Sequence, residues 1–171
     1  MATVDAILFK LAENQAERAG YFAVRHAIFV DEQGLFHETD VDEHDADPAT
    51  VPLVAVSGDS GEVVGAVRCY AAGDDVWYGG RLAVLAGYRR HPAAIGPNLC
   101  RLAEVSVSER GCRRFLAYIQ MQNVRFFQRL GWTVVGEPTE YHGQPHQLMA
   151  AALTVTRSEL IGAAAQATAH A

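Results

Sequence analysis

The sequence predicts a mixed α/β fold, an α+β arrangement in which hairpin-linked strands come first and strands then alternate with helices. Two apolar runs flank the turn sequence SGDSG, as in a β-hairpin. Other segments carry apolar residues at intervals of three and four, the pattern of amphipathic helices. Short apolar runs separate the later helices, which favours parallel strands beside antiparallel ones. We therefore expect a central mixed sheet of six to seven strands flanked by about four helices.

The first half of the chain supplies most of the predicted sheet. Apolar runs predict strands over residues 6–11, 53–56, 62–70 and 76–85. A helix follows the first strand, with Asn14 as a suitable cap and Gly34 as its end. Residues 39–50 are acidic and include Pro48, which predicts a solvated loop.

In the second half of the chain, predicted helices alternate with predicted strands. A helix is predicted over 97–110, because Pro97 suits its first turn and Gly111 stops it. A buried strand over 115–119 and a helix over 124–130 follow. The last two predicted strands are 133–136 and 147–153.

Length and composition restrict the class of protein. The 171 residues predict one domain over residues 1–155 and an Ala-rich tail, helical or disordered, over 156–171. A net charge of −6 argues against a nucleic-acid partner. No apolar run has the length of a membrane span, and three cysteines without metal-ligand spacing suit a reducing compartment. We expect a soluble cytoplasmic protein with no membrane partner.

One loop carries the first chemical signal. The strand WYGGRLAVL leads into a loop that Arg89 and Arg90 enter, and Ala93 to Gly96 connect this loop to a helix. Unpaired backbone N–H groups and the helix dipole both favour an anion at such a junction. We expect a ligand that bears phosphate.

The order of these pieces resembles the GNAT superfamily of acetyl-CoA-dependent acyltransferases over residues 5–153. The resemblance rests on an L-A-V strand end, Tyr-Arg, Ile-Gly, an Asn and an F-x-x-x-G-aromatic ending, here Leu82 to Val84, Tyr88-Arg89, Ile95-Gly96, Asn123 and Phe127 to Trp132. It implies the GNAT-type acyl-CoA N-acyltransferase fold and acetyl-CoA (coenzyme A) as the cofactor.

The resemblance also implies which residues hold the cofactor. The L-A-V strand pairs with the pantetheine arm in a splay between the fourth and fifth strands, amides of residues 90–97 hold the pyrophosphate, and the Asn contacts the arm from the other side. The implied cofactor residues are Leu82, Ala83, Val84, Arg89, Arg90, Ala94, Ile95, Gly96, Pro97, Asn98, Asn123, Phe126 and Phe127.

The chain departs from the family pattern in the loop. Pro92 and Ala94 occupy a region where a glycine is usual. Proline has no N–H to offer, and alanine resists positive φ. These residues predict either weaker cofactor binding or a loop path that uses the side chains of Arg89 and Arg90.

A second departure concerns catalysis. Phe127 stands where many relatives have the tyrosine that protonates the leaving thiolate, so Tyr141, Tyr118 and His146 are the candidate replacements. Gly79 and Gly80 stand near the position of a frequent catalytic glutamate, which leaves Glu32 and His146 as candidate bases. The predicted catalytic residues are thus Glu32, His146 and Tyr141. The alternatives are a solvated Glu32 and a histidine that only stabilises a strand end.

The N-terminal half is similar to a GNAT subgroup with an R-x-x-x-F-V-x-E-Q-G opening and a P-H-x-x-M ending, and also to acyl-homoserine-lactone synthases. This likeness implies an ion-pair network at the acceptor cleft that positions the substrate. Its implied members are Arg25, Phe29, Asp42, Asp45 and Arg68. The alternative is that the network anchors the acidic loop to the sheet.

The acidic loop also raises the question of a metal site. Its side chains are His37, Glu38, Asp40, Asp42, His44 and Asp45. Their types suit a metal, yet no helical His pair or Gly-containing calcium loop orders them, and we expect no metal.

The sequence as a whole suggests an N-acetyltransferase that acts on the amine of a small molecule within a ternary complex. Two alternatives stay open: an acyltransferase like the lactone synthases, and a non-catalytic acyl-CoA sensor. The apolar C-terminal strands favour a homodimer.

Overall fold

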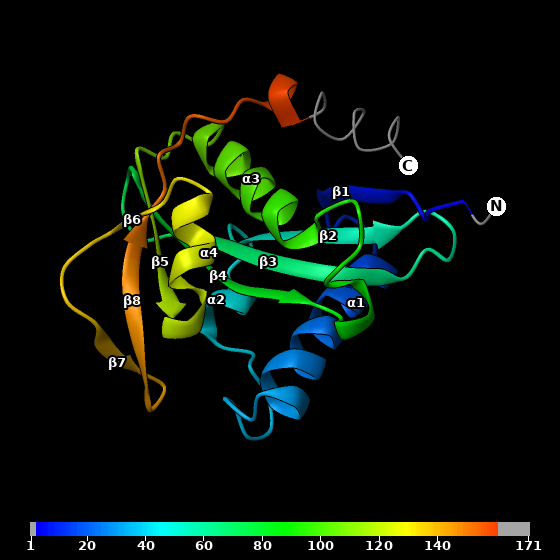
Figure 1. Ribbon diagram of the computed structural model, residues 1–171, viewed down its shortest axis with the longest axis horizontal. Coiled ribbons are helices and arrows are strands. Elements are labelled where there is room, and N and C mark those ends of the chain that lie inside the picture. Colours follow the sequence, from blue (N-terminus) through cyan, green and yellow to red (C-terminus); the bar gives the residue numbers. More distant parts are fainter. Residues whose placement is uncertain (1–2, 161–171) are drawn as a thin grey trace.

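The computed structural model describes residues 3–160 and shows one mixed sheet with helices on both faces (Figure 1). The eight strands follow the order β1-β2-β3-β4-β5-β8-β6, and β7 pairs with β8. The pair β4–β5 is parallel and the other pairs are antiparallel. The strands are β1 Ile7–Leu11, β2 Val51–Ser57, β3 Val63–Ala71, β4 Val76–Val84, β5 Arg114–Gln120, β6 Thr133–Val134, β7 Thr139–Tyr141 and β8 Gln144–Ala150. The predicted fold class is confirmed, and the sheet has one strand more than the upper prediction because the polar β7 gives no apolar signal.

Four α-helices have both ends inside the described residues, and three of them correspond to predicted helices. They are α1 Gln15–His26, α2 Glu43–Ala46, α3 Ile95–Ser108 and α4 Val124–Arg129, and a π-helix over Ala27–Glu32 continues α1. Asn14 caps α1 as expected, because its side chain accepts from the Glu17 amide in a capping box. Within the described residues, no helix is long and apolar enough to cross a membrane.

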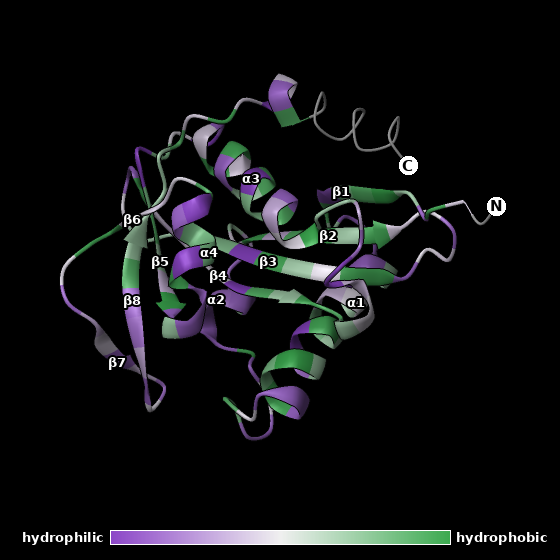
Figure 2. Cartoon of the chain, viewed as in Figure 1, coloured by the Kyte–Doolittle hydropathy of each residue, from purple (hydrophilic) through white to green (hydrophobic). Residues whose placement is uncertain are grey.

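Each face of the sheet has its own apolar core. Helix α1 covers one face and α3 the other (Figure 1). The strands β2 and β3 between them are largely hydrophobic (Figure 2). The α3 side approaches the sheet closely at Gly65, where an added Cβ would lie 2.9 Å from Ile95 and Leu99 side-chain atoms. The absence of a side chain at Gly65 therefore lets α3 pack closely on β3.

The central feature of the sheet is a split between β4 and β5. These strands pair only at Val76–Arg114, Trp77–Phe115 and Tyr78–Leu116. Beyond these pairs β4 stays with β3 and β5 stays with β8, so the two halves of the sheet diverge. The sequence resemblance implied such a splay.

A bulge in β4 lies beside the split. The β3–β4 register shifts between Ala66 and Arg68, so Arg81 and Leu82 have no partner residues across the ladder. Arg81 has a φ of 55°, a left-handed conformation that costs energy for a residue other than glycine.

Two segments differ from their predictions. The expected solvated loop over residues 39–50 contains α2, capped by Asp42, and Asp40 within it is only 2% exposed. Near the C-terminus, Arg157 pairs with Glu109 at 2.7 Å and Leu160 is buried, so the first residues of the predicted tail pack against the domain. The rest of the predicted tail, 161–171, lies outside the described residues.

Candidate active site

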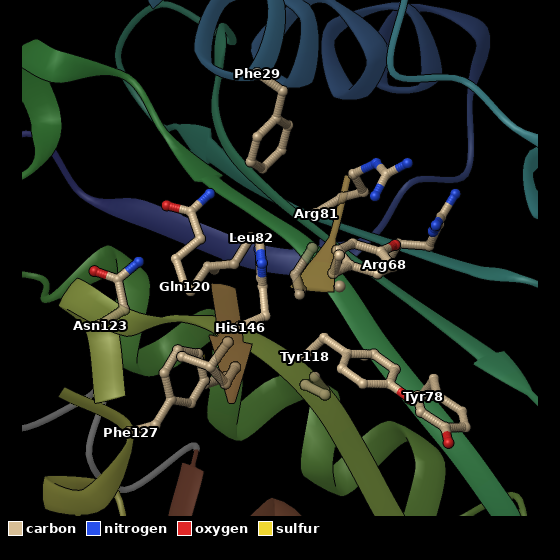
Figure 3. Close-up of a pocket in the computed structure, with 18 of the residues that line it drawn as sticks. Phe29, Arg68, Tyr78, Arg81, Leu82, Tyr118, Gln120, Asn123, Phe127 and His146 are labelled. Atoms are coloured by element: carbon tan, nitrogen blue, oxygen red, sulfur yellow. The ribbon is translucent and has the colours of Figure 1, made fainter. Parts of the chain in front are cut away.

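A cleft of about 130 Å³ opens where β4 and β5 separate. The cleft is lined by side chains from both diverging strands, from β8, and from Phe29 of the π-helix with the following Leu35 and Phe36. Figure 3 shows the His146 ring rising into the middle of the cleft, with Gln120 and Asn123 on one side and Arg68 and Arg81 on the other. The split in the sheet therefore produces the pocket.

His146 is the predicted catalytic residue that the structure places most centrally. It lies on β8, is 2% exposed, and its Nδ1 lies 2.9 Å from the Gln144 carbonyl oxygen. Because a carbonyl oxygen only accepts, Nδ1 carries the proton in this bond. In the neutral ring Nε2 then has the free lone pair, which is the form that a general base needs.

Tyr141 lies beside His146 at the edge of a row of aromatic rings. The Tyr141 and His146 ring centroids are 5.1 Å apart, and Tyr118 stacks on Tyr141 at 5.3 Å with planes 7° apart. Tyr78 and Tyr70 continue this tyrosine row across β4 and β3. Burial raises the pKa of both Tyr70 and Tyr78, so these phenols stay protonated. All four tyrosines line the cleft.

Glu32, the other predicted base, is not brought to the cleft. It lies at the end of the π-helix, and both of its carboxylate oxygens accept from the Arg89 guanidinium. This hydrogen bonding lowers the pKa of Glu32. A paired, exposed carboxylate outside the lining residues is a poor base. No local motif predicts this pairing, because the partners are 57 residues apart.

The predicted phosphate loop takes an unexpected backbone path. Ala94, the N-cap of α3, has φ 49° and ψ 64°, so alanine adopts the left-handed conformation that we expected it to resist. The Ala94 amide donates to the His91 carbonyl at 3.0 Å, and the Ala93 amide donates to His91 Nδ1 at 3.0 Å. Asn98 Nδ2 donates to the Ala93 carbonyl at 2.6 Å. Internal hydrogen bonds therefore stabilise the strained turn.

The same loop leaves donors free at the start of α3. The backbone N–H groups of Ile95 and Gly96 have no hydrogen-bond partner among the described residues. Pro97 follows and has no N–H. The side chain of Arg89 is committed to Glu32 and to the Val84 carbonyl, whereas Arg90 forms no ion pair within residues 3–160. Two main-chain donors and one guanidinium of this loop are thus without partners among the described residues and are available to an anion.

Of the other predicted cofactor residues, some line the cleft and others pack behind its lining. Leu82, Asn123 and Phe127 line the cleft. Ala83 is buried in the core on the α1 side. Phe126 packs against Phe127 at 5.1 Å between ring centroids and lies beside Gly96, so it connects α4 to the loop.

The predicted acceptor residues form one ion-pair network. Arg25 contacts Asp45 at 2.7 Å and 2.9 Å, and Arg68 contacts Asp42 at 2.6 Å and 3.0 Å. Arg68 also reaches Asp45 at 3.1 Å and so joins the two pairs. Phe29 and Arg68 line the cleft, while the other members lie behind this wall.

Sequence reasoning missed two members of the network. Asp40 accepts from Arg25 Nε at 2.7 Å and from Arg81 Nε at 3.1 Å, and the Asp40 carbonyl accepts from Arg81 Nη2 at 2.9 Å. Arg81 is the residue with positive φ in the β4 bulge, so the network holds the bulge in place. The α2 segment is thereby tied to α1, β3 and β4.

The charges of the network balance, and most of its groups are buried. Three arginines face three aspartates, and both Arg25 and Arg68 are at most 2% exposed. Burial alone raises the pKa of Asp45, but hydrogen bonds from Arg25 and the Asp42 amide outweigh it and lower the pKa to about 2. Asp45 therefore stays ionised at neutral pH, and each of the three carboxylates already contacts an arginine.

Residues 12–132 match the sequence model of the acetyltransferase (GNAT) family. The chain belongs to this family. The superfamily resemblance is thus confirmed, and the narrower subgroup with the P-H-x-x-M ending stays a prediction. No curated protein matches the GNAT chain in sequence.

Solved structures agree with this membership. A Lactobacillus plantarum protein with an N-acetyltransferase assignment superposes with a TM-score of 0.75 at 25% identity, over 85% of this chain and 97% of that one. Escherichia coli ElaA gives a TM-score of 0.72 at 20% identity, over 86% and 99% of the chains. BjaI, a CoA-dependent acyl-homoserine lactone synthase bound to SAM and isopentyl-CoA, gives 0.68 at 20% identity, over 95% and 89%. The last two show that the fold is shared.

Proposed function

We propose that this GNAT protein transfers an acyl group from a coenzyme A thioester, in the simplest case acetyl-CoA, to the amine of a small molecule. The observation that carries the proposal is the open split between β4 and β5 with His146 at its centre. In this proposal the pantetheine arm lies along Leu82 to Val84 and Asn123. The pyrophosphate binds the free amides of Ile95 and Gly96 and the side chain of Arg90.

Each step of the transfer has a candidate group. His146 Nε2 removes a proton from the ammonium or the attacking amine, directly or through water. The amine nitrogen bonds to the thioester carbon, and the C–S bond breaks. Arg81 and Leu82 lie outside the β3–β4 ladder, so their amides are candidates to stabilise the carbonyl oxygen as it gains charge. Tyr141, beside His146, donates a proton to the thiolate that leaves.

The ion-pair network has a positioning role in this proposal. It fixes α2 and the β4 bulge, and through Arg68 and Phe29 it shapes the wall against which the acceptor lies. Glu32 has no catalytic role in the proposal, because it pairs with Arg89 outside the cleft.

The assembled network favours one second candidate function. The chain resembles acyl-homoserine-lactone synthases in the residues that build it, so S-adenosylmethionine is a candidate acceptor. Mass spectrometry of reactions with acyl-CoA and S-adenosylmethionine would detect a lactone product. Absence of that product, together with N-acylation of simple amines, would reject this candidate.

The cellular setting is also proposed from the sequence. The three cysteines are free and buried, which suits a reducing cytoplasm. A homodimer is testable by light scattering at several protein concentrations.

Calorimetry with acetyl-CoA tests the proposed donor. We expect saturable binding that is weakened by Arg90→Ala and unaffected by the matched exposed change Arg113→Ala. The release of free CoA from acetyl-CoA in the presence of each of a panel of primary amines then tests transfer. An absence of heat and of thermal shift with both acetyl-CoA and CoA would reject the proposal.

A further inference from the structure

The cleft continues through the sheet to the α3 side. Arg68 and Tyr78 line it on the face that α1 and α2 cover, whereas Cys100 and Ala103 of α3 line it on the opposite face. This passage exists because β4 and β5 stop pairing after Tyr78 and Leu116.

The inner end of the cleft has apolar walls. We call this end the acyl chamber and define it by Gly79, Cys100, Ala103, Phe115, Ala117 and Trp132. Its members from α3 and β5 are at most 5% exposed, and Trp132 is 4% exposed. Burial raises the pKa of the Cys100 thiol, which therefore stays a neutral wall group.

The walls of the acyl chamber combine small and large side chains. Ala103 and Ala117 are small, whereas Phe115 and Trp132 contribute large rings to the same wall. At Gly79 even one added carbon would lie 2.8 Å from Phe115 Cζ, so this ring occupies the position that a larger strand residue would fill. The two arginines of the cleft, Arg68 and Arg81, contact the aspartates on the α1 side instead.

We propose that the acyl chamber holds the hydrocarbon chain of an acyl-CoA donor longer than acetyl. The inference rests on the proposed function, because it requires the thioester to lie at the β4–β5 split. The chamber is only one part of a cleft of about 130 Å³, so we expect short acyl chains such as butyryl or hexanoyl rather than long fatty acyl chains. A two-carbon acetyl group leaves the chamber walls without contacts.

Calorimetry with CoA, acetyl-CoA, butyryl-CoA and hexanoyl-CoA tests the chamber without knowledge of the acceptor. Each methylene buried there is expected to tighten binding about fourfold, so butyryl-CoA, with two more methylenes, should bind roughly 15-fold more tightly than acetyl-CoA. If all four compounds bind with equal affinity, or if the affinity falls as the acyl chain becomes longer, the chamber is overturned and the proposed function stands. No binding of any of the four compounds would overturn both.

Two variants localise the effect. Ala103→Phe fills the chamber and should remove the chain-length dependence while CoA itself still binds. Ser108→Phe places the same side chain at the exposed end of the same helix and should leave the series unchanged. A chain-length dependence that survives in a folded Ala103→Phe protein would overturn the assignment.

A spectroscopic readout covers the case in which Ala103→Phe does not fold. The chain has two tryptophans, and Trp132 lines the cleft whereas Trp77 packs in the core. In a Trp77→Phe protein, hexanoyl-CoA should shift the Trp132 emission and acetyl-CoA should shift it much less. Equal shifts with both compounds would contradict the chamber.

Discussion

Two charged regions of the molecule differ in how completely their polar groups are paired. The network of Arg25, Arg68 and Arg81 with three aspartates is buried and its charges balance. The loop before α3 instead leaves the Ile95 and Gly96 amides and the Arg90 guanidinium without partners in the described part of the chain. Paired buried charges fix a structure, whereas unpaired donors near the surface are available to a ligand. The difference predicts that changes in the first region alter stability and changes in the second alter binding.

The largest expected effect comes from Asp40→Ala. The change leaves Arg25 and Arg81 with an uncompensated buried charge, which typically costs about 3–5 kcal/mol. Urea unfolding measures this loss in free energy of unfolding. The nearby exposed change Glu38→Ala is the control, with an expected effect within about 0.5 kcal/mol. Similar small effects in both variants would show that the network is not structural.

His146→Gln should affect rate and leave the fold intact. Glutamine keeps a donor for the Gln144 carbonyl but lacks a basic nitrogen, so kcat should fall about 10²- to 10³-fold. The melting temperature and the affinity for CoA should change little. The exposed change His37→Gln serves as the control in the same assay. An unchanged kcat would remove His146 from the proposed mechanism.

Glu104 on α3 is a buried carboxyl group outside both regions, and it gives a pH-dependent prediction. Burial raises its pKa from 4.5 to about 7, and Arg101 and the Leu153 amide only partly oppose this. Between these two values the folded protein binds more protons than the unfolded chain, so stability falls as pH rises from about 4.5 to about 7. Glu104→Gln removes this penalty and should stabilise the protein by about 1–3 kcal/mol at pH 8, with little difference at pH 4.5.

Thermal unfolding across this pH range measures the difference. Glu109→Gln, an exposed change just after the same helix, removes the ion pair with Arg157, which lowers the pKa of Glu109, so any difference should be destabilising and should grow with rising pH, opposite in sign to Glu104→Gln. A constant difference between Glu104→Gln and the native protein from pH 4.5 to pH 8 would contradict the assignment.

The smallest expected effect concerns the strained turn. Ala94 has positive φ, and glycine adopts that conformation without steric cost, so Ala94→Gly should stabilise the protein by up to about 1 kcal/mol. The adjacent Ala93→Gly should destabilise by about 0.4–1 kcal/mol, because Ala93 does not have positive φ. Denaturant unfolding measures the change in free energy of unfolding for each variant. Changes of the same sign in both would contradict the strain at Ala94.

The sequence predicted those parts of the fold that have a local periodic signal. Strands 7–11 and 63–71 and helix α3 all lie close to their predicted ranges because apolar spacing and caps mark them. Helix α2 was missed since its four residues, two of them acidic, give no apolar period, although Asp42 and Asp45 form a capping box that the D-x-x-D spacing signals.

The candidate site was predictable where a motif names it and not where distant partners meet. His146 and Tyr141 lie together in the cleft, as their proximity in sequence suggests. The ion pair of Arg81 could not be predicted from the sequence, because a bulge with positive φ, rather than a motif, turns its side chain toward Asp40, 41 residues earlier. The commitment of Glu32 to Arg89 was hidden for the same reason.

A crystal structure with bound CoA tests the central claim most directly. The account predicts the pantetheine arm in the split between β4 and β5, and the pyrophosphate within hydrogen-bond distance of the Ile95 and Gly96 amides. A CoA molecule bound elsewhere, or a split that closes to restore β4–β5 pairing beyond Tyr78, would contradict it.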